Sequence, residues 1–156
     1  MGSQIDITRA QLGDIPVLAG LLEELFAAES EFEADRAAQQ AALRLLLAEP
    51  GDSAIFVARR AGRVVGMVSL LAQVSTALGG RTYVLEDMVV SAAERGRGVG
   101  GRLLDRALAH ADATGARRVT LLTDADNDGA HRFYARRGFT RSAMVVLRRQ
   151  RDSGTD

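Results

Sequence analysis

The chain has 156 residues, 47% of them hydrophobic and 26% charged, which is typical of one soluble globular domain. Its 20 basic and 20 acidic residues balance, so it lacks the basic excess that attracts nucleic acid or anionic membranes. It contains no Cys and no Lys, which excludes disulfides, thiol nucleophiles and lysine Schiff bases. His110 and His131 are far apart, so no metal site is expected. No apolar run reaches the roughly 20 residues of a membrane span and no signal-peptide pattern opens the sequence, so we expect a cytoplasmic, bacterial protein.

Apolar periodicity predicts a short strand and two helices in the N-terminal part of the chain. Ile5 and Ile7 alternate with polar residues, as on one face of a strand. Asp14 is predicted to be the N-cap of the first helix, with Pro16 in its first turn. The apolar face of that helix is formed, at helical spacing, by Ile15, Leu18, Leu22, Leu25 and Phe26. A second helix is expected over 36–49.

The remaining chain alternates strands and helices around glycine-rich turns. A hairpin is predicted over 54–75, with its turn at Ala61 and Gly62 between two β-branched runs. The elements expected after it are a strand over 82–90, a helix that Gly115 ends, a strand over 118–123, a helix over 126–137 capped by Asp126 or Asn127 and a last strand over 142–149.

The order of these elements predicts a mixed sheet and an α/β class of fold. Three consecutive strands favour antiparallel pairing, whereas the strand–helix–strand unit over 82–123 favours one parallel crossover. No internal repeat or long linker divides the chain. We therefore expect a single domain over 1–150, followed by a disordered tail at 151–156.

The stretch RGRGVGG, which precedes the helix ended by Gly115, contains two overlapping motifs. Read from Gly96, it contains G-x-G-x-x-G, the dinucleotide fingerprint. Read from Arg95, it contains R-x-x-G-x-G. A dinucleotide fold places its first glycine directly after the first strand of the sheet, but here SAAER intervenes and several elements come first. Too little chain follows Asp124 for the rest of a doubly wound sheet, so the dinucleotide interpretation is disfavoured.

Either motif offers a row of backbone N–H groups at the start of a helix, where the helix dipole favours an anion. Glycine lets the backbone approach a diphosphate closely. Arg95 and Arg97 add cations that can pair with phosphate oxygens. The loop therefore predicts a site for a phosphorylated cofactor, and a turn that binds nothing is the alternative.

The sequence resembles the GNAT superfamily of acyl-CoA-dependent N-acyltransferases through four features over about 82–140. These features are the strand LEDMVV, the loop RGRGVG that opens a helix, the strand RVTLLT, and a helix with N-x-x-A-x-x-x-Y from Asn127 to Tyr134 followed by Gly138-Phe139. The resemblance implies the GNAT fold, a mixed, mostly antiparallel sheet of six to seven strands with about four helices and a splayed parallel strand pair. The strand motif is most similar to the diamine (spermidine/spermine) N-acetyltransferase branch.

The resemblance also implies that acetyl-CoA is the cosubstrate. The pantetheine arm would lie between the splayed strands, the loop amides would hold the diphosphate, and Asn127 would contact the arm from the far side. The cofactor-binding residues implied in this way are Met88, Val89, Val90, Arg95, Gly96, Arg97, Gly98, Val99, Gly100, Gly101, Asn127 and Tyr134.

Acetylation of an amine requires two proton transfers. An amine with a pKa near 10.4 must lose a proton, and the departing CoA thiolate must gain one. Tyr134 matches the usual general acid of the family, and Glu86, in the LED stretch, is the candidate base. Asp87 is the alternative base, because alternation places the two carboxylates on opposite faces unless a bulge intervenes. With no Cys for an acyl-enzyme, direct attack by the amine is expected.

The acceptor is expected to be a small cationic amine, because an acidic run lies where this family walls its acceptor site. The run comprises Glu29, Glu31, Glu33 and Asp35. A solvated charged loop is the alternative interpretation. The competing functions are acetylation of protein Lys side chains or N-termini, and a non-catalytic acyl-CoA-binding module. The family resemblance also implies a homodimer.

Overall fold

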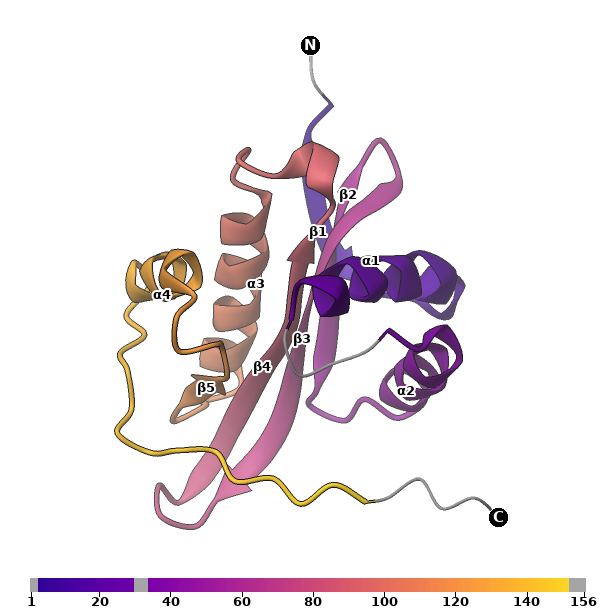
Figure 1. The fold of residues 1–156 in the computed structure, drawn as a ribbon. Coiled ribbons are helices and arrows are strands. Elements are labelled where there is room, and N and C mark those ends of the chain that lie inside the picture. The colour runs from indigo at the N-terminus through magenta and orange to yellow at the C-terminus, as the bar shows by residue number, and fades with distance from the viewer. Residues whose placement is uncertain (1–2, 30–33, 152–156) are drawn as a thin grey trace. The chain divides into compact units, whose positions relative to one another are not determined.

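The computed structural model describes residues 3–29 and 34–151, and its central feature is one five-stranded sheet (Figure 1). The strands, in spatial order, are β1 (Ile5–Arg9), β2 (Ala54–Arg60), β3 (Arg63–Ser75), β4 (Gly80–Val90) and β5 (Val119–Leu121). The first four strands are antiparallel neighbours, and β5 is parallel to β4. The mixed sheet predicted from the order of elements is therefore confirmed.

The chain divides into two compact units, residues 1–122 and 123–156. The first unit holds the whole sheet, the helices α1 (Ile15–Ala28), α2 (Arg36–Ala48) and α3 (Val99–Ala113), and two short 3₁₀ helices, η1 (Leu12–Asp14) and η2 (Ala92–Glu94). The second unit holds α4 (Asp128–Ala135) and the chain that follows it. The expectation of a single domain over 1–150 stays a prediction, and residues 152–156 of the expected tail lie outside the described residues.

The expected six to seven strands are not found, because the described residues form five. The predicted strand at 142–149 is absent. That segment has no regular secondary structure, and Met144 and Leu147 are 89% and 91% exposed. An apolar, β-branched run gives a segment only a tendency to form a strand, because a strand becomes stable when its backbone groups pair with those of a neighbouring strand. The expectation of about four helices is met by α1 to α4.

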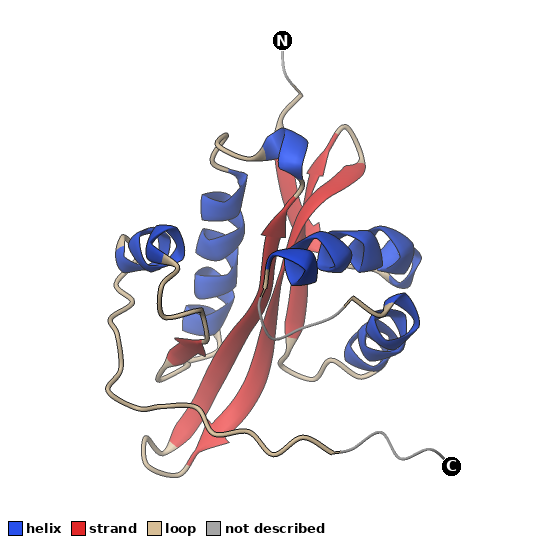
Figure 2. Ribbon diagram, in the orientation of Figure 1, coloured by secondary structure: helices blue, strands red, loops and turns tan. Residues whose placement is uncertain are grey.

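Helices cover both faces of the sheet within the first unit (Figure 1, Figure 2). α1 and α2 lie on one face and α3 lies on the other. The buried face of α1 carries Ile15, Leu18 and Leu22 at the predicted spacing. Because both faces are covered, central strand residues such as Phe56 and Val57 are fully buried side by side, and residues 54–58 of β2 are apolar without alternation.

The β2–β3 hairpin turn lies where the sequence predicts it. Ala61 and Gly62 have φ angles of 50° and 78°, the pair of left-handed conformations that a tight hairpin turn requires. The turn follows Arg59 and Arg60 directly.

The start of α1 differs from the prediction in one detail. Asp14 is the N-cap residue of α1, as predicted, but its carboxylate accepts no hydrogen bond from the first turn of that helix. It accepts a hydrogen bond from the Gln11 backbone N–H at 2.8 Å and pairs with the Arg59 guanidinium at 2.6 Å. Arg59 offers a charged partner that the local sequence around Asp14 does not reveal.

Candidate active site

The glycine loop joins β4 to α3 and contains two left-handed glycines. Gly96 and Gly98 have φ angles of 76° and 80°, and a Cβ added at either position would meet no atom within 4 Å. The requirement for glycine is therefore the backbone conformation and not the space. Gly98 is the N-cap of α3, so the loop ends at the positive end of a 15-residue helix dipole. This is the backbone arrangement that binds phosphate.

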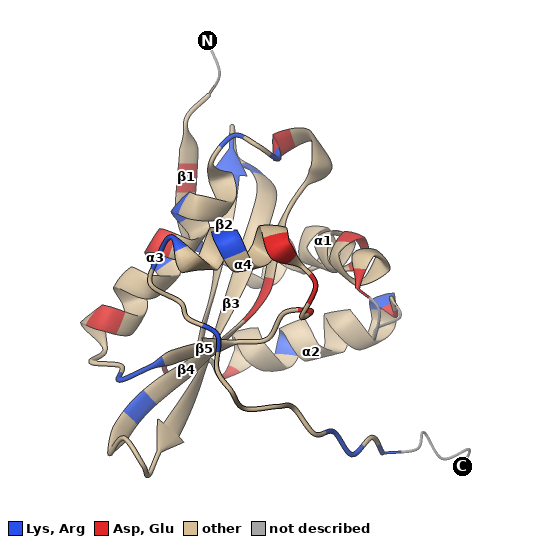
Figure 3. Ribbon diagram, turned by 60° about the vertical axis from the view of Figure 1, so that its left-hand side comes forward, with Lys and Arg blue, Asp and Glu red and all other residues tan. Residues whose placement is uncertain are grey.

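The two arginines of the loop have different surroundings. The Arg95 Nε donates to the Val90 carbonyl at 3.0 Å, which ties the loop to the end of β4. The Arg97 side chain is 62% exposed, and its guanidinium lies 3.9 Å from the Glu94 carboxylate. Figure 3 colours the basic and acidic residues at this end of the sheet. Both side chains are exposed, and Arg95 is the one tied to the backbone of β4.

The outer edge of β4 is only partly covered by β5. The parallel ladder joins Tyr83–Leu85 to Val119–Leu121, and β5 ends there. Among the described residues, no strand pairs with the same edge of β4 over Met88–Val90. The end of the ladder is what a splayed strand pair requires, and it leaves a strand edge on which an extended ligand can lie.

A β-bulge lies in β4 at the two acidic residues. On β3, Ser69 pairs with Glu86. Two positions earlier on β3, Met67 pairs with Val89, which lies three positions later on β4, so β4 holds one extra residue. Asp87 has a φ of 55°, a conformation that Asp tolerates better than most residues. The bulge breaks the alternation that would place the two carboxylates on opposite faces.

The carboxyl group of Asp87 has a strongly perturbed environment. Burial, then the negative charges of Glu86 and Glu29, raise the pKa of Asp87 from 3.8 to about 6, against a lowering effect of Ser69. The Ser69 hydroxyl lies 3.4 Å from the Asp87 carboxylate. Glu86 is exposed, whereas Asp87 is half-buried. The shifted pKa thus belongs to Asp87, and which of the two carboxylates is the base stays a prediction.

The acidic run after α1 contributes to this site in part. Glu29 directly follows α1, and its charge acts on Asp87. Asp35 instead caps α2, where its carboxylate accepts from the Ala38 N–H at 3.1 Å. Glu31 and Glu33 lie outside the described residues. Of the described members of the run, Glu29 is therefore the one that shapes the electrostatics at Asp87.

The second compact unit carries the other two predicted site residues. Of the two predicted caps, Asp126 and Asn127, it is Asn127 that caps α4, by accepting from the Ala130 N–H at 3.1 Å. Tyr134 packs edge-on against Phe133 and Phe139, with ring centroids 4.9 and 5.6 Å away. Burial raises the pKa of Tyr134 to about 12. Its hydroxyl therefore keeps its proton at neutral pH, which a general acid needs.

Sequence reasoning missed Ser69 and the ion pair between Arg60 and Glu94. The position of Ser69 depends on the register between β3 and β4, and the ion pair joins the end of β2 to η2, so no local pattern encodes either contact. The described helices include none long and apolar enough to cross a membrane. The described residues likewise contain no group of side chains suited to hold a metal ion.

The mixed sheet, the glycine loop after β4 and the partly open strand edge are the features that the resemblance to acyl-CoA-dependent acyltransferases implies. Residues 19–139 match the family model described as the acetyltransferase (GNAT) family. The chain belongs to this family, and it is an acetyl-CoA-dependent N-acetyltransferase. It is 30% identical over 145 residues to YhfO of Bacillus subtilis strain 168, an N-acetyltransferase described as uncharacterised, and the match covers 91% of this chain and 94% of the relative.

Two further relatives match over part of the chain. An aminoalkylphosphonate N-acetyltransferase of Salmonella typhimurium is 36% identical over 86 residues, which are 55% of this chain and 56% of that protein. A mycothiol acetyltransferase of Thermobispora bispora is 38% identical over 99 residues, 61% of this chain and 32% of that protein. Their names specify different acceptors, so the family does not determine the amine.

Solved structures show the same fold. One from Agrobacterium tumefaciens strain C58, provisionally described as an acetyltransferase, has a TM-score of 0.79 at 30% identity and covers 93% of this chain and 99% of its own. An aminoglycoside N-acetyltransferase in complex with CoA has a TM-score of 0.80 at 21% identity and covers 97% of each chain. At that identity the second likeness concerns the fold alone.

Proposed function

We propose that this protein acetylates the primary amine of a small, positively charged molecule by direct attack on acetyl-CoA. The bulge in β4 carries the proposal. It presents Asp87 together with Glu86 and within the influence of Glu29, on the strand that leads into the glycine loop. Carboxylates that converge in this way attract a cation. Their mutual repulsion also raises the pKa of Asp87, which makes this carboxylate a better proton acceptor.

The residues of the first unit fit the cosubstrate. Acetyl-CoA supplies an activated acetyl thioester. We assign its diphosphate to the backbone amides of residues 96–101 and to the Arg97 guanidinium, because the left-handed glycines and the start of α3 suit an anion. The backbone of Met88–Val90 would pair with the pantetheine arm. The role of Asn127 stays the one that the family resemblance implies.

We assign the role of base to Asp87 in place of Glu86. An alkylammonium ion with a pKa near 10.4 is almost fully protonated at neutral pH, so its proton must be removed. The Asp87 carboxylate accepts that proton, and the nitrogen lone pair forms the C–N bond while the C–S bond breaks. By the family resemblance, the Tyr134 hydroxyl would give its proton to the departing thiolate, and the second proton that the nitrogen loses as the amide forms would restore that hydroxyl through solvent. A pKa of about 6 leaves Asp87 ionised at neutral pH and makes it a stronger base than an ordinary carboxylate.

A panel of amines tests the substrate class. CoA release from acetyl-CoA is measured with a polyamine, an aminoglycoside, a Lys-containing peptide and an aminoalkylphosphonate. We expect the highest kcat/KM for the polyamine or the aminoglycoside, because the site is acidic. The phosphonate carries a negative charge, so a preference for it would contradict the charge argument and favour the activity for which the Salmonella relative is named. A preference for the peptide would favour protein acetylation, and CoA binding without turnover would favour a binding module.

A further inference from the structure

An ion pair joins the end of β2 to the segment before the glycine loop. Arg60 is the last residue of β2, and its Nε donates to both Glu94 carboxylate oxygens at 3.1 Å. Its Nη2 lies 3.0 Å from Oε2 of the same carboxylate. Only 23% of the Arg60 side chain and 12% of the Glu94 side chain are exposed. A partly buried pair with several bonds has a more defined geometry than an exposed surface pair.

Glu94 stands at the entry of the glycine loop. It ends η2, where its backbone N–H donates to the Ser91 carbonyl at 2.9 Å, and residues 95–101 follow it directly. At the far side of the loop, α3 packs against the sheet. The ion pair therefore holds the entry of the loop to the sheet, while α3 holds its exit.

We propose that the Arg60–Glu94 ion pair is a positioning device, which keeps the glycine loop in the conformation that binds the CoA diphosphate. This inference rests on the proposed binding of diphosphate by residues 96–101. Charge alone predicts the opposite effect of Glu94, because a carboxylate close to a phosphate site repels the ligand. Removal of the Glu94 charge therefore distinguishes the two roles. It raises the KM for acetyl-CoA if the ion pair positions the loop, and it lowers this KM if Glu94 mainly repels the ligand. A loop that is already ordered binds its ligand without the cost of ordering.

Glu94→Gln is the first test. We expect the KM for acetyl-CoA to rise about tenfold while kcat changes by less than about twofold, since the loop contacts a part of the cosubstrate remote from the reacting thioester. Glu94→Asp keeps the charge but shortens the side chain, and we expect it to raise the KM in the same direction. An unchanged or lower KM in both variants would overturn the inference.

The neighbouring ion pair offers a matched control. Arg59, adjacent to Arg60 on β2, makes a two-bond pair with Asp14 at 3.0 and 2.6 Å, with side chains 21% and 12% exposed. Asp14→Asn should lower stability toward urea about as much as Glu94→Gln, yet leave the KM for acetyl-CoA at the wild-type value. Equal increases in KM for both variants would mean a general loosening of the fold and would overturn a specific role for Glu94.

Gly98→Val tests the proposed cofactor site separately. A β-branched residue cannot readily adopt the φ of 80° found at Gly98, so we expect loss of CoA binding in calorimetric titration. Unchanged affinity in Gly98→Val would refute the loop as the diphosphate site. Lost affinity in Gly98→Val, together with a wild-type KM in both Glu94 variants, would refute only the positioning role.

Discussion

At the scale of single residues, Asp87 links catalysis to pH. Its pKa of about 6 means that kcat/KM should fall below about pH 6, because a protonated carboxyl cannot accept the amine proton. We expect Asp87→Asn to lower kcat by about 100-fold or more and to remove this acidic limb. Steady-state rates between pH 5 and 8 measure both effects. Glu86→Gln is the matched control, and if it causes the larger loss, Glu86 is the base.

The same residue couples activity to stability. The pKa of Asp87 is raised from 3.8 in the unfolded chain to about 6 in the folded protein. Between about pH 4 and pH 6 the Asp87 carboxyl is therefore protonated to a greater extent in the folded state than in the unfolded state. The free energy of unfolding should therefore decrease as the pH rises from about 4 to 6 and stay lower at pH 7. Asp87→Asn removes this cost and should be about 1–3 kcal/mol more stable than the wild type at pH 7. Urea unfolding at pH 7 and pH 4 should show the difference shrinking at the lower pH.

At the scale of elements, the contact between α3 and the sheet depends on Gly66. A Cβ at this position would lie 3.0 Å from Leu103 Cδ1 and 3.1 Å from the Val89 carbonyl oxygen. Gly66→Ala should therefore lower the free energy of unfolding by about 1–3 kcal/mol, as other overpacked sites do. Thermal or urea unfolding measures the loss.

Gly20 is the control for this packing effect. It lies within α1, and a Cβ added there would meet no atom within 4 Å. Gly20→Ala should stabilise the protein by about 0.5–1 kcal/mol through helix propensity. Equal destabilisation by both substitutions would contradict the close approach of α3 to the sheet at Gly66.

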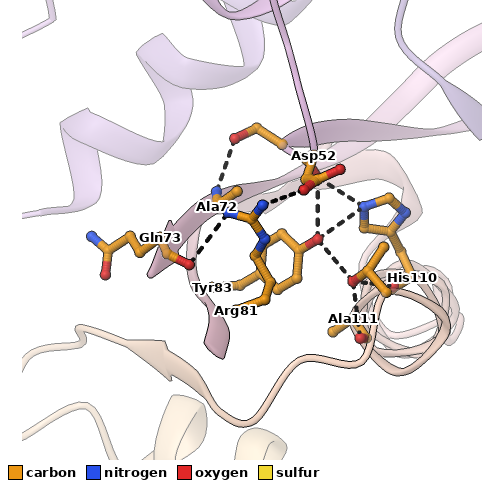
Figure 4. A network of polar contacts seen from close by, with 9 residues as sticks. Asp52, Ala72, Gln73, Arg81, Tyr83, His110 and Ala111 are labelled. Atoms are coloured by element: carbon orange, nitrogen blue, oxygen red, sulfur yellow. Dashed lines mark hydrogen bonds and ion pairs between the residues drawn. The ribbon is translucent and has the colours of Figure 1, made fainter. Parts of the chain in front are cut away.

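At the scale of the whole molecule, one polar network ties together segments of the first unit that are distant in sequence (Figure 4). The His110 Nε2 lies 2.9 Å from the Asp52 carbonyl, which only accepts hydrogen bonds, so this nitrogen carries the proton. Tyr83 of β4 donates to the same carbonyl at 3.3 Å, and its hydroxyl lies 2.9 Å from the Thr114 hydroxyl. The network thereby connects the chain before β2 to β4 and to the end of α3.

His110→Leu should lower the free energy of unfolding by about 1–3 kcal/mol, because it leaves buried polar partners with fewer hydrogen bonds. His131 provides a matched comparison, since its Nε2 also lies 3.0 Å from a carbonyl oxygen, that of Asp124, but in an exposed setting. His131→Leu should cost less than about 0.5 kcal/mol. Urea unfolding of both variants measures the contrast, and equal losses would contradict a buried network centred on His110.

Predictions from the sequence were accurate where the physical cause is local. The turn at Ala61 and Gly62, the cap of α4 at one of the two predicted residues, Asn127, and the end of α3 before Gly115 depend on residues within a few positions of each other. Predictions that needed a distant partner were less accurate. Asp14 lies at the predicted N-cap position, but its carboxylate pairs with Arg59 and not with the helix, and the apolar run at 142–149 does not form a strand.

The sequence by itself determined the order of the elements up to β5, the loop that suits a diphosphate and the family, because each rests on short-range patterning and motif spacing. Only the tertiary structure decided that Asp87 is the carboxylate with the raised pKa, and that Arg60 holds Glu94 beside the loop. The register between β3 and β4, which creates the bulge at Asp87, is a property of two strands together. Burial likewise exists only after the helices have packed on the sheet, and burial is the main cause of the pKa shift on which the proposed chemistry depends.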